Sequence, residues 1–172
     1  IPEFAIGRIT GRSAAEIGAA VAKTVAYAGV AAAPAGEPWL RRLHFVADDG
    51  SALNPFERAA DELASVAQPA YTIEQSYLAA IGSAGAARAL VRQRLDAGSL
   101  LALYVGHGNV TTWAVERLFD VDDADRLANG PRTPIVVALN CLNGYFTDAE
   151  APAALAEAFL RRAGGGAVGV WA

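Results

Sequence analysis

The chain has 172 residues, enough for one domain with a substantial hydrophobic core. Hydrophobic residues make up 53% and charged residues 19% of the chain, a balance that excludes a disordered protein. The net charge of -4 and the scattered arginines argue against nucleic-acid binding, because phosphate recognition needs clustered Lys and Arg.

The chain contains one cysteine and no methionine. A single cysteine cannot form an internal disulfide, so cysteine usage does not indicate the redox compartment. No signal peptide is visible at Ile1, and we expect one domain over residues 1–172 that belongs to a longer precursor. The segment most like a membrane span, Ile17 to Ala33, contains Lys23 and precedes Pro34, which favours a core-facing helix instead.

Capping signals and apolar spacing predict four helices. Ser13 to Glu16 has capping-box spacing and starts a helix from about Ala14 to Tyr27. The run Asn54-Pro55-Phe56-Glu57 starts a second, which continues to about Val66, with Pro55 as its first helical residue. The other two are expected at Ala84 to Leu95, closed by Gly98, and at about Pro152 to Ala163.

Short runs between these helices predict strands at Leu43 to Ala47, Ala70 to Tyr77, Leu100 to Val105, Ile135 to Leu139 and Ala167 to Trp171. Three of them are continuously apolar, as expected for strands covered by helices on both faces. Strands that alternate with helices predict right-handed crossovers and a mostly parallel sheet. Ile1 to Ile9 is a candidate for a sixth strand at an edge of this sheet.

Open parallel sheets carry their functional sites beyond the carboxyl ends of the strands. The strong polar candidates of this chain all follow predicted strands, in Asp48-Asp49-Gly50, Gly106-His107-Gly108-Asn109 and Asn140-Cys141-Leu142-Asn143-Gly144. The pattern therefore predicts that His107 and Cys141 meet at one edge of the sheet.

A cysteine attacks well only as a thiolate, which requires a nearby base, and His107 is the predicted base. The alternative for Cys141 is a buried small hydrophobic residue, but Asn140 and the Asn143-Gly144 turn indicate an exit from a strand. The alternative for His107 is a turn histidine, although glycines on both sides favour close approach of a substrate. We interpret His44, which lies inside a strand, as structural.

Six segments carry a resemblance to a known family: Ile1 to Ile9, Lys23 to Tyr27, Phe45 to Asp49, Tyr104 to Gly108 with Trp113, Asn140 to Phe146, and Gly164 to Val168. They resemble the gingipain family of cysteine peptidases, peptidase family C25. The resemblance covers nearly the whole chain in the right order, and the Gly-His-Gly and Cys-x-Asn-Gly-x-Phe pair is its most specific part.

The resemblance implies an α/β fold of the three-layer caspase-like type, with a mostly parallel central sheet and helices on both faces. By position, His107 matches the family's catalytic histidine and Cys141 its nucleophile. The backbone N–H groups of Gly108 and Cys141 match the oxyanion hole. The implied function is a cysteine endopeptidase that cleaves polypeptides through a Cys141 thioester, with His107 as general base and then acid.

Asp48 is our candidate for a third catalytic residue that orients His107, with a solvated turn as the alternative. Candidates for lining the substrate pocket are Asn109, Trp113, Asn140 and Asn143. For Trp113 the alternative is packing beneath the His107 loop.

We expect no required cofactor and no metal at the catalytic residues. The resembled family often binds calcium, so a structural calcium ion is an alternative at the acidic run Asp120, Asp122, Asp123 and Asp125. Its spacing is not that of an EF-hand loop. We therefore expect Asp122 or Asp123 to cap a short helix that runs into Leu127.

The same residues are compatible with two alternatives to hydrolysis. A sortase-like transpeptidase of a secretion system would use the same acyl-enzyme and resolve it with an amine, and a catalytically silent caspase-like module would serve interaction alone. The resemblance also implies an extracytoplasmic location, secreted or at the bacterial surface, and flanking domains of the precursor as partners. The preference of gingipains for Arg or Lys is not transferred, because no residue here matches their acidic pocket.

Overall fold

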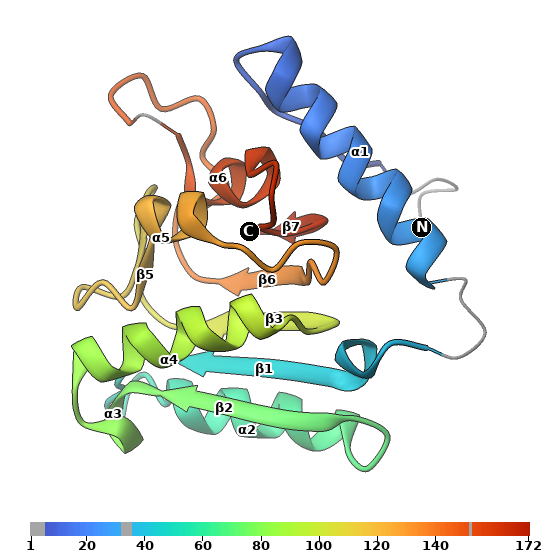
Figure 1. The fold of residues 1–172 in the computed structure, drawn as a ribbon. Coiled ribbons are helices and arrows are strands. Elements are labelled where there is room, and N and C mark those ends of the chain that lie inside the picture. The colour runs from blue at the N-terminus through green and yellow to red at the C-terminus, as the bar shows by residue number, and fades with distance from the viewer. Residues whose placement is uncertain (1–5, 32–35, 152) are drawn as a thin grey trace.

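The computed structural model describes residues 6–31, 36–151 and 153–172. Its centre is a sheet in the order β2-β1-β3-β6-β7, and neighbouring strands pair in parallel throughout (Figure 1). The strands are β1 (Arg42–Ala47), β2 (Thr72–Tyr77), β3 (Leu101–Val105), β6 (Ile135–Leu139) and β7 (Gly169–Trp171). The parallel sheet predicted from the alternation of strands and helices is confirmed.

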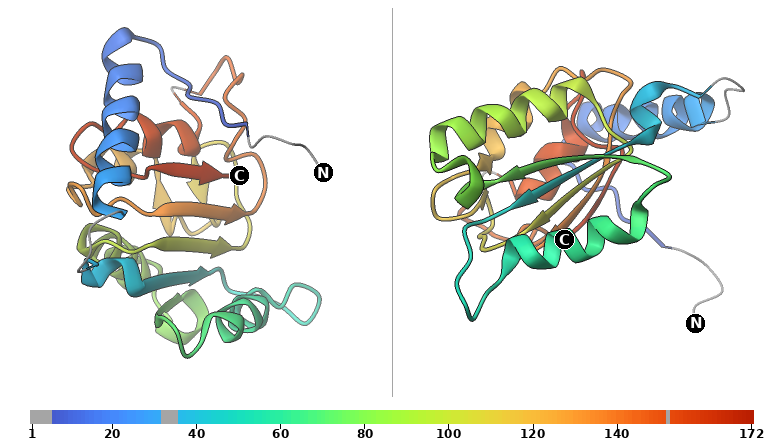
Figure 2. Two further views of the ribbon diagram at one scale, coloured as in Figure 1. Left: turned by 90° about the vertical axis from the view of Figure 1, so that its right-hand side faces the viewer. Right: turned by 90° about the horizontal axis from the view of Figure 1, so that it is seen from below.

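Helices cover both faces of this sheet, as the three-layer prediction required. The helices are α1 (Ala14–Ala31), α2 (Phe56–Ala67), α3 (Leu78–Ile81), α4 (Ala84–Ala97), α5 (Val121–Arg126), α6 (Leu155–Arg161) and the 3-10 turn η1 (Pro38–Arg41). Figure 2 shows α2 and α4 on opposite sides of the strands. A small antiparallel hairpin, β4 (Thr112–Trp113) and β5 (Phe119–Asp120), lies beside α5.

Two hydrophobic cores separate the layers. Side chains alternate across each strand, so Leu103 and Val105 pack toward α2 whereas Ala102 and Tyr104 pack toward α4, α5 and α6. On the second side the aromatic rings of Tyr104, Trp113, Phe119 and Phe159 form one group of stacked and tilted pairs, with centroid separations from 4.6 to 5.9 Å. The β4–β5 hairpin is therefore part of the core.

The strand order reverses between β1 and β3. The chain leaves β1 through α2 to the outer strand β2, then returns through α3 and α4 to β3 on the other side of β1. In open parallel sheets, the loops at the carboxyl ends of such a reversal diverge and leave room for a site. The loops after β1 and β3 are in this position.

The helix boundaries differ from the predicted ones for local reasons. α1 continues past Tyr27 to Ala31, because an alanine-rich sequence favours helix. α2 begins at Phe56, with Pro55 as its N-cap and not its first helical residue, since a Ser51–Asn54 turn takes up the preceding backbone groups. α6 begins at Leu155, after a turn in which Asp148 accepts hydrogen bonds from the N–H groups of Glu150 and Ala151; Pro152 lies outside the described residues.

The proposed sixth strand is not formed over its described part. Residues 6–9 have no strand conformation, and residues 1–5 lie outside the description. The segment instead passes over the loop after β6, where the guanidinium of Arg8 lies 4.8 Å from the centroid of the Phe146 ring.

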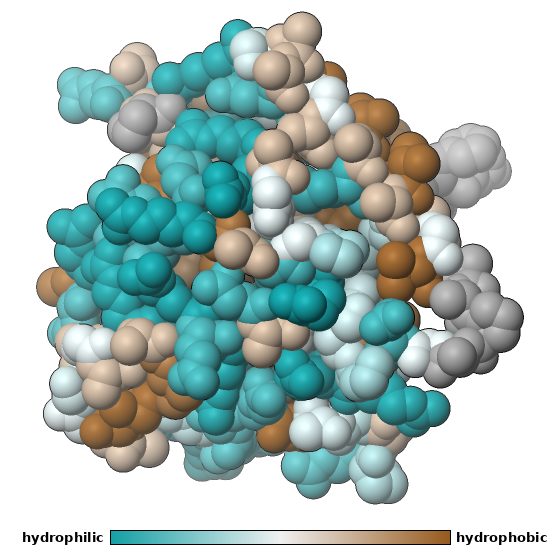
Figure 3. All heavy atoms as spheres, in the orientation of Figure 1, coloured by the Kyte–Doolittle hydropathy of each residue, from teal (hydrophilic) through white to brown (hydrophobic). Residues whose placement is uncertain are grey.

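Helix α1 is attached to the outside of the molecule, along α6. Lys23 Nζ donates to the carbonyl oxygens of Phe159 and Gly165 at 3.0 Å each, and burial, helped by the charge of Arg162, lowers the pKa of Lys23 to about 8. Val21 and Val25 are exposed, and Figure 3 shows apolar residues along this flank of the molecule. The core-facing helix expected here is therefore a surface helix held by a narrow stripe. Across the described ranges, no helix combines the length and apolar character needed to cross a bilayer.

Candidate active site

Three polar residues leave three neighbouring strands at the same level. The pairs Ala47↔Val105 and Val105↔Leu139 are the last of their ladders, and Asp48, His107 and Cys141 lie just beyond them. Asp48 N donates to Val105 O at 3.1 Å and Gly106 N to Leu139 O at 3.4 Å, so the strands remain joined as the loops begin. The structure thus brings the three residues to one edge of the sheet.

Both members of the predicted dyad are accessible to solvent. Cys141 is an exposed free cysteine, which excludes the buried-hydrophobe alternative. His107 is also exposed. Leu142, directly after the cysteine, has φ of 64°, a left-handed conformation that is rare for a leucine. The turn that presents Cys141 is therefore held in place by its surroundings against its own backbone preference.

The backbone of His107 is fixed by two side chains. Its N–H donates to Asp48 Oδ2 at 3.0 Å, and its carbonyl accepts from the Tyr104 hydroxyl at 2.6 Å. The imidazole ring packs edge-on against Phe56, with centroids 5.0 Å apart and an interplanar angle of 85°. No pattern in the sequence marks Phe56 as functional, although its position at the start of the helix after β1 puts it at the same sheet edge.

Asp48 is 1% exposed, whereas Asp49 is exposed, so the solvated-turn alternative does not describe Asp48. Its described hydrogen bonds come from the main-chain N–H groups of His107 and Asp49, the latter at 2.9 Å. Burial raises the pKa of Asp48, and these two donors oppose that rise. Asp48 therefore supports the loop that carries His107, while direct orientation of the ring stays a prediction.

Asn143 joins the two loops that carry the dyad. It is 2% exposed, and its Nδ2 donates to Asn109 O at 2.5 Å and to Thr112 O at 3.3 Å. Its Oδ1 accepts from Asn140 Nδ2 at 2.8 Å. Of the predicted pocket residues, Asn140 and Asn143 thus bond to each other, and Asn143 is directed into the protein.

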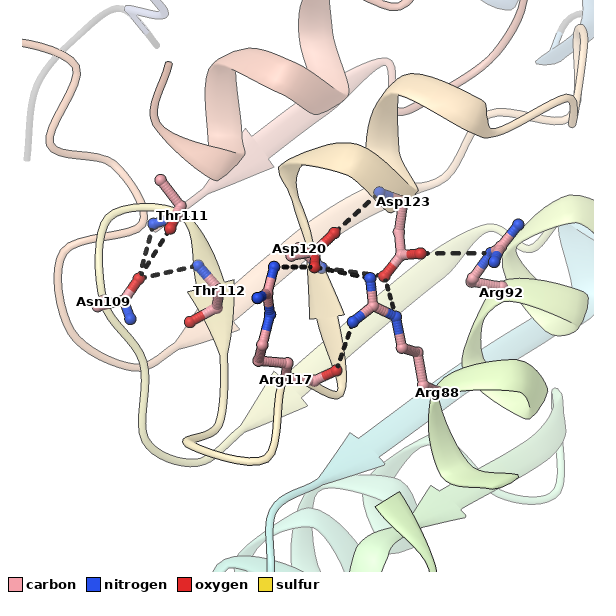
Figure 4. Close-up of polar contacts among 8 residues, drawn as sticks. All are labelled: Arg88, Arg92, Asn109, Thr111, Thr112, Arg117, Asp120 and Asp123. Carbon is pink, nitrogen blue, oxygen red and sulfur yellow. Dashed lines mark hydrogen bonds and ion pairs between the residues drawn. The ribbon is translucent and has the colours of Figure 1, made fainter. Parts of the chain in front are cut away.

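The other two pocket candidates are also held by internal contacts. Asn109 Oδ1 accepts hydrogen bonds from Thr111 N, Thr111 Oγ1 and Thr112 N, forming the compact turn drawn in Figure 4. Trp113 is completely buried and stacks on Tyr104 at 4.6 Å beneath the His107 loop. Packing, the alternative considered for Trp113, is the role that the structure shows.

Gly108 has a steric reason to be glycine. A Cβ at this position would lie 2.0 Å from Asn140 Nδ2 and 3.2 Å from Thr112 O. The close approach of the two loops requires the missing side chain. The oxyanion roles of the Gly108 and Cys141 N–H groups remain predictions.

The acidic run after β5 forms a helix cap and an ion-pair network. Asp120 is the N-cap of α5: its Oδ1 accepts from Asp123 N at 3.0 Å, and Asp123 Oδ2 accepts from Asp120 N at 3.2 Å. The expectation that Asp122 or Asp123 would be the cap is wrong, because β5 delivers Asp120 in the extended conformation that an N-cap needs. Asp123 takes the reciprocal position of a capping box.

Arginines surround these two carboxylates (Figure 4). Arg88 contacts Asp120 at 2.6 Å and Asp123 at 2.9 Å, and Arg117 contacts Asp120 at 2.8 Å. Burial alone would raise the pKa of Asp120. The N–H of Asp123 and the two guanidinium groups outweigh burial and hold this pKa below its ordinary value. The cluster thus ties α4 to the β4–β5 hairpin.

One group of described residues brings three carboxylates close enough to share a cation. Oxygen atoms of Asp48, Asp49 and Glu116 lie within 4.8 Å of one another. Asp48 already accepts from two N–H groups, and the arginine pairs occupy Asp120 and Asp123. Calcium remains a prediction for this chain.

Two solved structures of gingipain RgpB have a similar fold. One is the crystal structure of the Arg-specific cysteine proteinase gingipain R (RgpB), 22% identical, with a TM-score of 0.74 over 90% of this chain and 35% of that one. Another is a complex of the Porphyromonas gingivalis RgpB pro- and mature domains, 24% identical, with a TM-score of 0.81 over 99% of this chain and 40% of that one. The chain therefore spans well under half of these proteins, and they establish the caspase-like fold.

Sequence comparison gives the family. A search of curated proteins found no match. The family described as peptidase family C25, in contrast, matches residues 1–172. Together with the arrangement of His107 and Cys141 at the sheet edge, this match over the whole chain shows that the chain belongs to peptidase family C25.

Proposed function

We propose that this chain carries the catalytic residues of a cysteine endopeptidase. The observation that supports the proposal is that exposed Cys141 and exposed His107 lie on loops that follow adjacent strands and are joined through Asn143. A thiol and an imidazole on adjoining loops, both open to solvent, suit nucleophilic catalysis better than structural roles.

In the proposed reaction, His107 removes the proton of the Cys141 thiol and the sulfur attacks the scissile carbonyl carbon. The C–S bond forms as the carbonyl becomes an oxyanion, which the N–H groups of Gly108 and Cys141 would stabilise. His107 then gives its proton to the amide nitrogen as the C–N bond breaks, leaving a thioester. Water, deprotonated by His107, releases the acid product and restores the thiol.

The wider setting of the reaction is also proposed from the family. We infer polypeptide substrates, flanking domains of a precursor as partners, and a location outside the cytoplasm. The pro- and mature-domain complex is known for RgpB, and it supports a precursor partner here only by likeness of fold. Neither the transpeptidase nor the silent-module alternative is favoured by an observation in the structure.

Alkylation of Cys141 tests the dyad directly. The chain has one cysteine, so iodoacetamide adduct formation followed by intact mass reports Cys141 alone. At pH 7 we expect His107→Ala to slow alkylation by about tenfold or more, because the base that favours the thiolate is lost.

The matched control is Val66→Ala, since Val66 is 84% exposed on α2, and this variant should label like the wild type. Equal labelling rates for wild type and His107→Ala would contradict the dyad. Peptide hydrolysis with and without an added amine then distinguishes a peptidase from a transpeptidase.

A further inference from the structure

A buried amide lies between the two loops of the proposed dyad, and it has no access to a substrate. Asn143 is 2% exposed, with Nδ2 and Oδ1 both bonded inside the protein. We propose that Asn143 is a positioning residue that fixes the separation of His107 and Cys141 by joining their loops. This inference rests on the proposed peptidase function and specifies how its site is held together.

The two loops that carry His107 and Cys141 are joined to each other both before and after these residues. Before the dyad, Val105 pairs with Leu139 as β3 and β6 end. After it, Asn143 Nδ2 donates to the carbonyl of Asn109 at 2.5 Å. The intervening residues, which include His107 and Cys141, therefore form two short arches fixed at both ends.

The chemistry of an amide is needed at this position. Nδ2 donates to two main-chain carbonyls, those of Asn109 and Thr112, while Oδ1 accepts from Asn140. An aspartate of the same shape has acceptors only, so it would place a carboxylate oxygen against two carbonyl oxygens. In a buried site such unpaired groups are costly, which makes the bonds of Asn143 specific for asparagine.

Helix α6 holds the same two loops through its first residues. Leu155 N donates to Val110 O in the His107 loop at 2.8 Å, and Ala156 N donates to Asn143 O in the Cys141 loop at 3.1 Å. Both arches thus rest on one rigid element, and the Asn143 side chain joins them to each other. A displacement of about 1 Å in such a pair is enough to lower a rate about 100-fold.

The chain offers a matched control in Asn129. This asparagine is also completely buried, and it bonds Gly166 on both sides, with Nδ2 to O at 2.9 Å and Oδ1 from N at 2.8 Å. It lies before β6, at the opposite edge of the sheet. Asn129→Ala therefore removes a comparable internal contact without touching the dyad loops.

The experiment measures the pH dependence of Cys141 alkylation by iodoacetamide in the folded chain, together with thermal unfolding. For Asn143→Ala and Asn143→Asp we expect rates at pH 7 at least about tenfold below wild type, with pH profiles displaced toward that of His107→Ala. Asn129→Ala should be destabilised as Asn143→Ala is, yet keep the wild-type alkylation profile.

The results that would contradict the positioning role differ from those that would contradict the dyad. Wild-type profiles in both Asn143 variants, or an equal slowing in Asn129→Ala, would overturn the positioning role while leaving the dyad intact. A wild-type rate in His107→Ala would instead remove the proposed function and the inference with it. If Asn143→Ala fails to fold, Asn140→Ala is the second test, because it removes the donor to Asn143 Oδ1 from a half-buried position. Its pH profile of alkylation should also be displaced toward that of His107→Ala, and a wild-type profile would overturn the positioning role.

Discussion

Phe56 limits how the imidazole of His107 can turn. The two rings meet edge to face at 85° with 5.0 Å between centroids, the arrangement that aromatic quadrupoles favour. Phe56 is the first residue of α2, so a helix that covers one face of the sheet also supplies a wall for the histidine. The direction of the ring nitrogens is therefore coupled to the position of α2.

We expect Phe56→Ala to slow Cys141 alkylation at pH 7 by about threefold to tenfold, because an edge-to-face contact is worth about 0.5–1.5 kcal/mol. Phe56→Leu, which keeps most of the volume but not the ring, should show nearly the same loss. Stopped-flow or quenched alkylation kinetics provide the measurement. A wild-type rate in Phe56→Leu would indicate that volume, not the aromatic contact, orients the histidine.

Single residues differ in how far the sequence reveals them. Asp48, His107 and Cys141 follow apolar strands, so the rule for parallel sheets predicts their common edge. The contacts of Asn143 depend on loop conformation, including the positive φ of Leu142, which no pattern in the sequence indicates. Phe56 is equally hidden, because an aromatic residue at a helix start is usually part of the core.

Among the elements, the β4–β5 hairpin depends on a charge network rather than on its own pairing. The hairpin has two short strands, and Arg88 of α4 contacts both Asp120, at its end, and Asp123 of α5. Asp123 is completely buried, so removal of Arg88 leaves its carboxylate paired with Arg92 alone, at 3.4 Å. These salt bridges thus join α4, which precedes His107 in the chain, to β5 and α5, which follow it.

Replacing Arg88 by Met keeps the alkyl stem and removes the charge, and we expect it to lower the free energy of unfolding by about 1.5–3 kcal/mol, because Asp120 and Asp123 keep Arg117 and Arg92. The control is Arg58→Met, which breaks the exposed Arg58–Glu62 pair and should change stability by less than about 0.5 kcal/mol. Urea denaturation of both variants gives the comparison. Equal small effects would show that the network around Asp120 and Asp123 is not stabilising.

Element boundaries were predicted where local rules act alone. As predicted, α4 begins at Ala84 and is closed by Gly98, and β6 has the predicted limits. The start of α5 was missed because the choice among Asp120, Asp122 and Asp123 is made by the end of β5, a two-residue strand too short to recognise in sequence.

The molecule as a whole carries a pH sensitivity in its sheet that is separate from the site. His44 is completely buried in β1, its Nε2 lies 3.0 Å from Ser76 Oγ, and burial, with the nearby Arg94, lowers the pKa of His44 to about 3. The folded state therefore binds this proton less well than the unfolded chain. Stability is fully present above the ordinary pKa of 6.5 and is lost as pH falls from there toward 3.

We expect this one group to reduce the free energy of unfolding by at most about 1.4 kcal/mol per pH unit over that window. His44→Gln should flatten the pH dependence between pH 6 and 4, whereas the exposed, non-titrating control Val66→Ala should keep the wild-type slope. Thermal melts in a pH series test both. A wild-type slope in His44→Gln would assign the acid sensitivity to other groups.

The parallel character of the central sheet was predictable from sequence, because apolar runs and helical spacing alternate along the chain. The position of α1 was not, since its alanine-rich sequence has no strongly apolar face, and its attachment depends on Lys23 reaching two carbonyl oxygens of a distant segment. Patterns within a helix do not contain such long-range polar contacts.

The parallel register of β3 and β6 allows the spacing of the His107 imidazole and the Cys141 thiol to change only in discrete steps. Strands can shift only by whole residues, about 3.3 Å each, and every single step also turns the side chains to the other face. The pair Val105↔Leu139 therefore sets the spacing of His107 and Cys141 to within one residue step. Exchanging one apolar residue for another within the strands does not change this spacing by smaller amounts. Fine tuning of reactivity is left to the arches beyond the ladder, where substitutions at glycines and amides act on distances smaller than one residue.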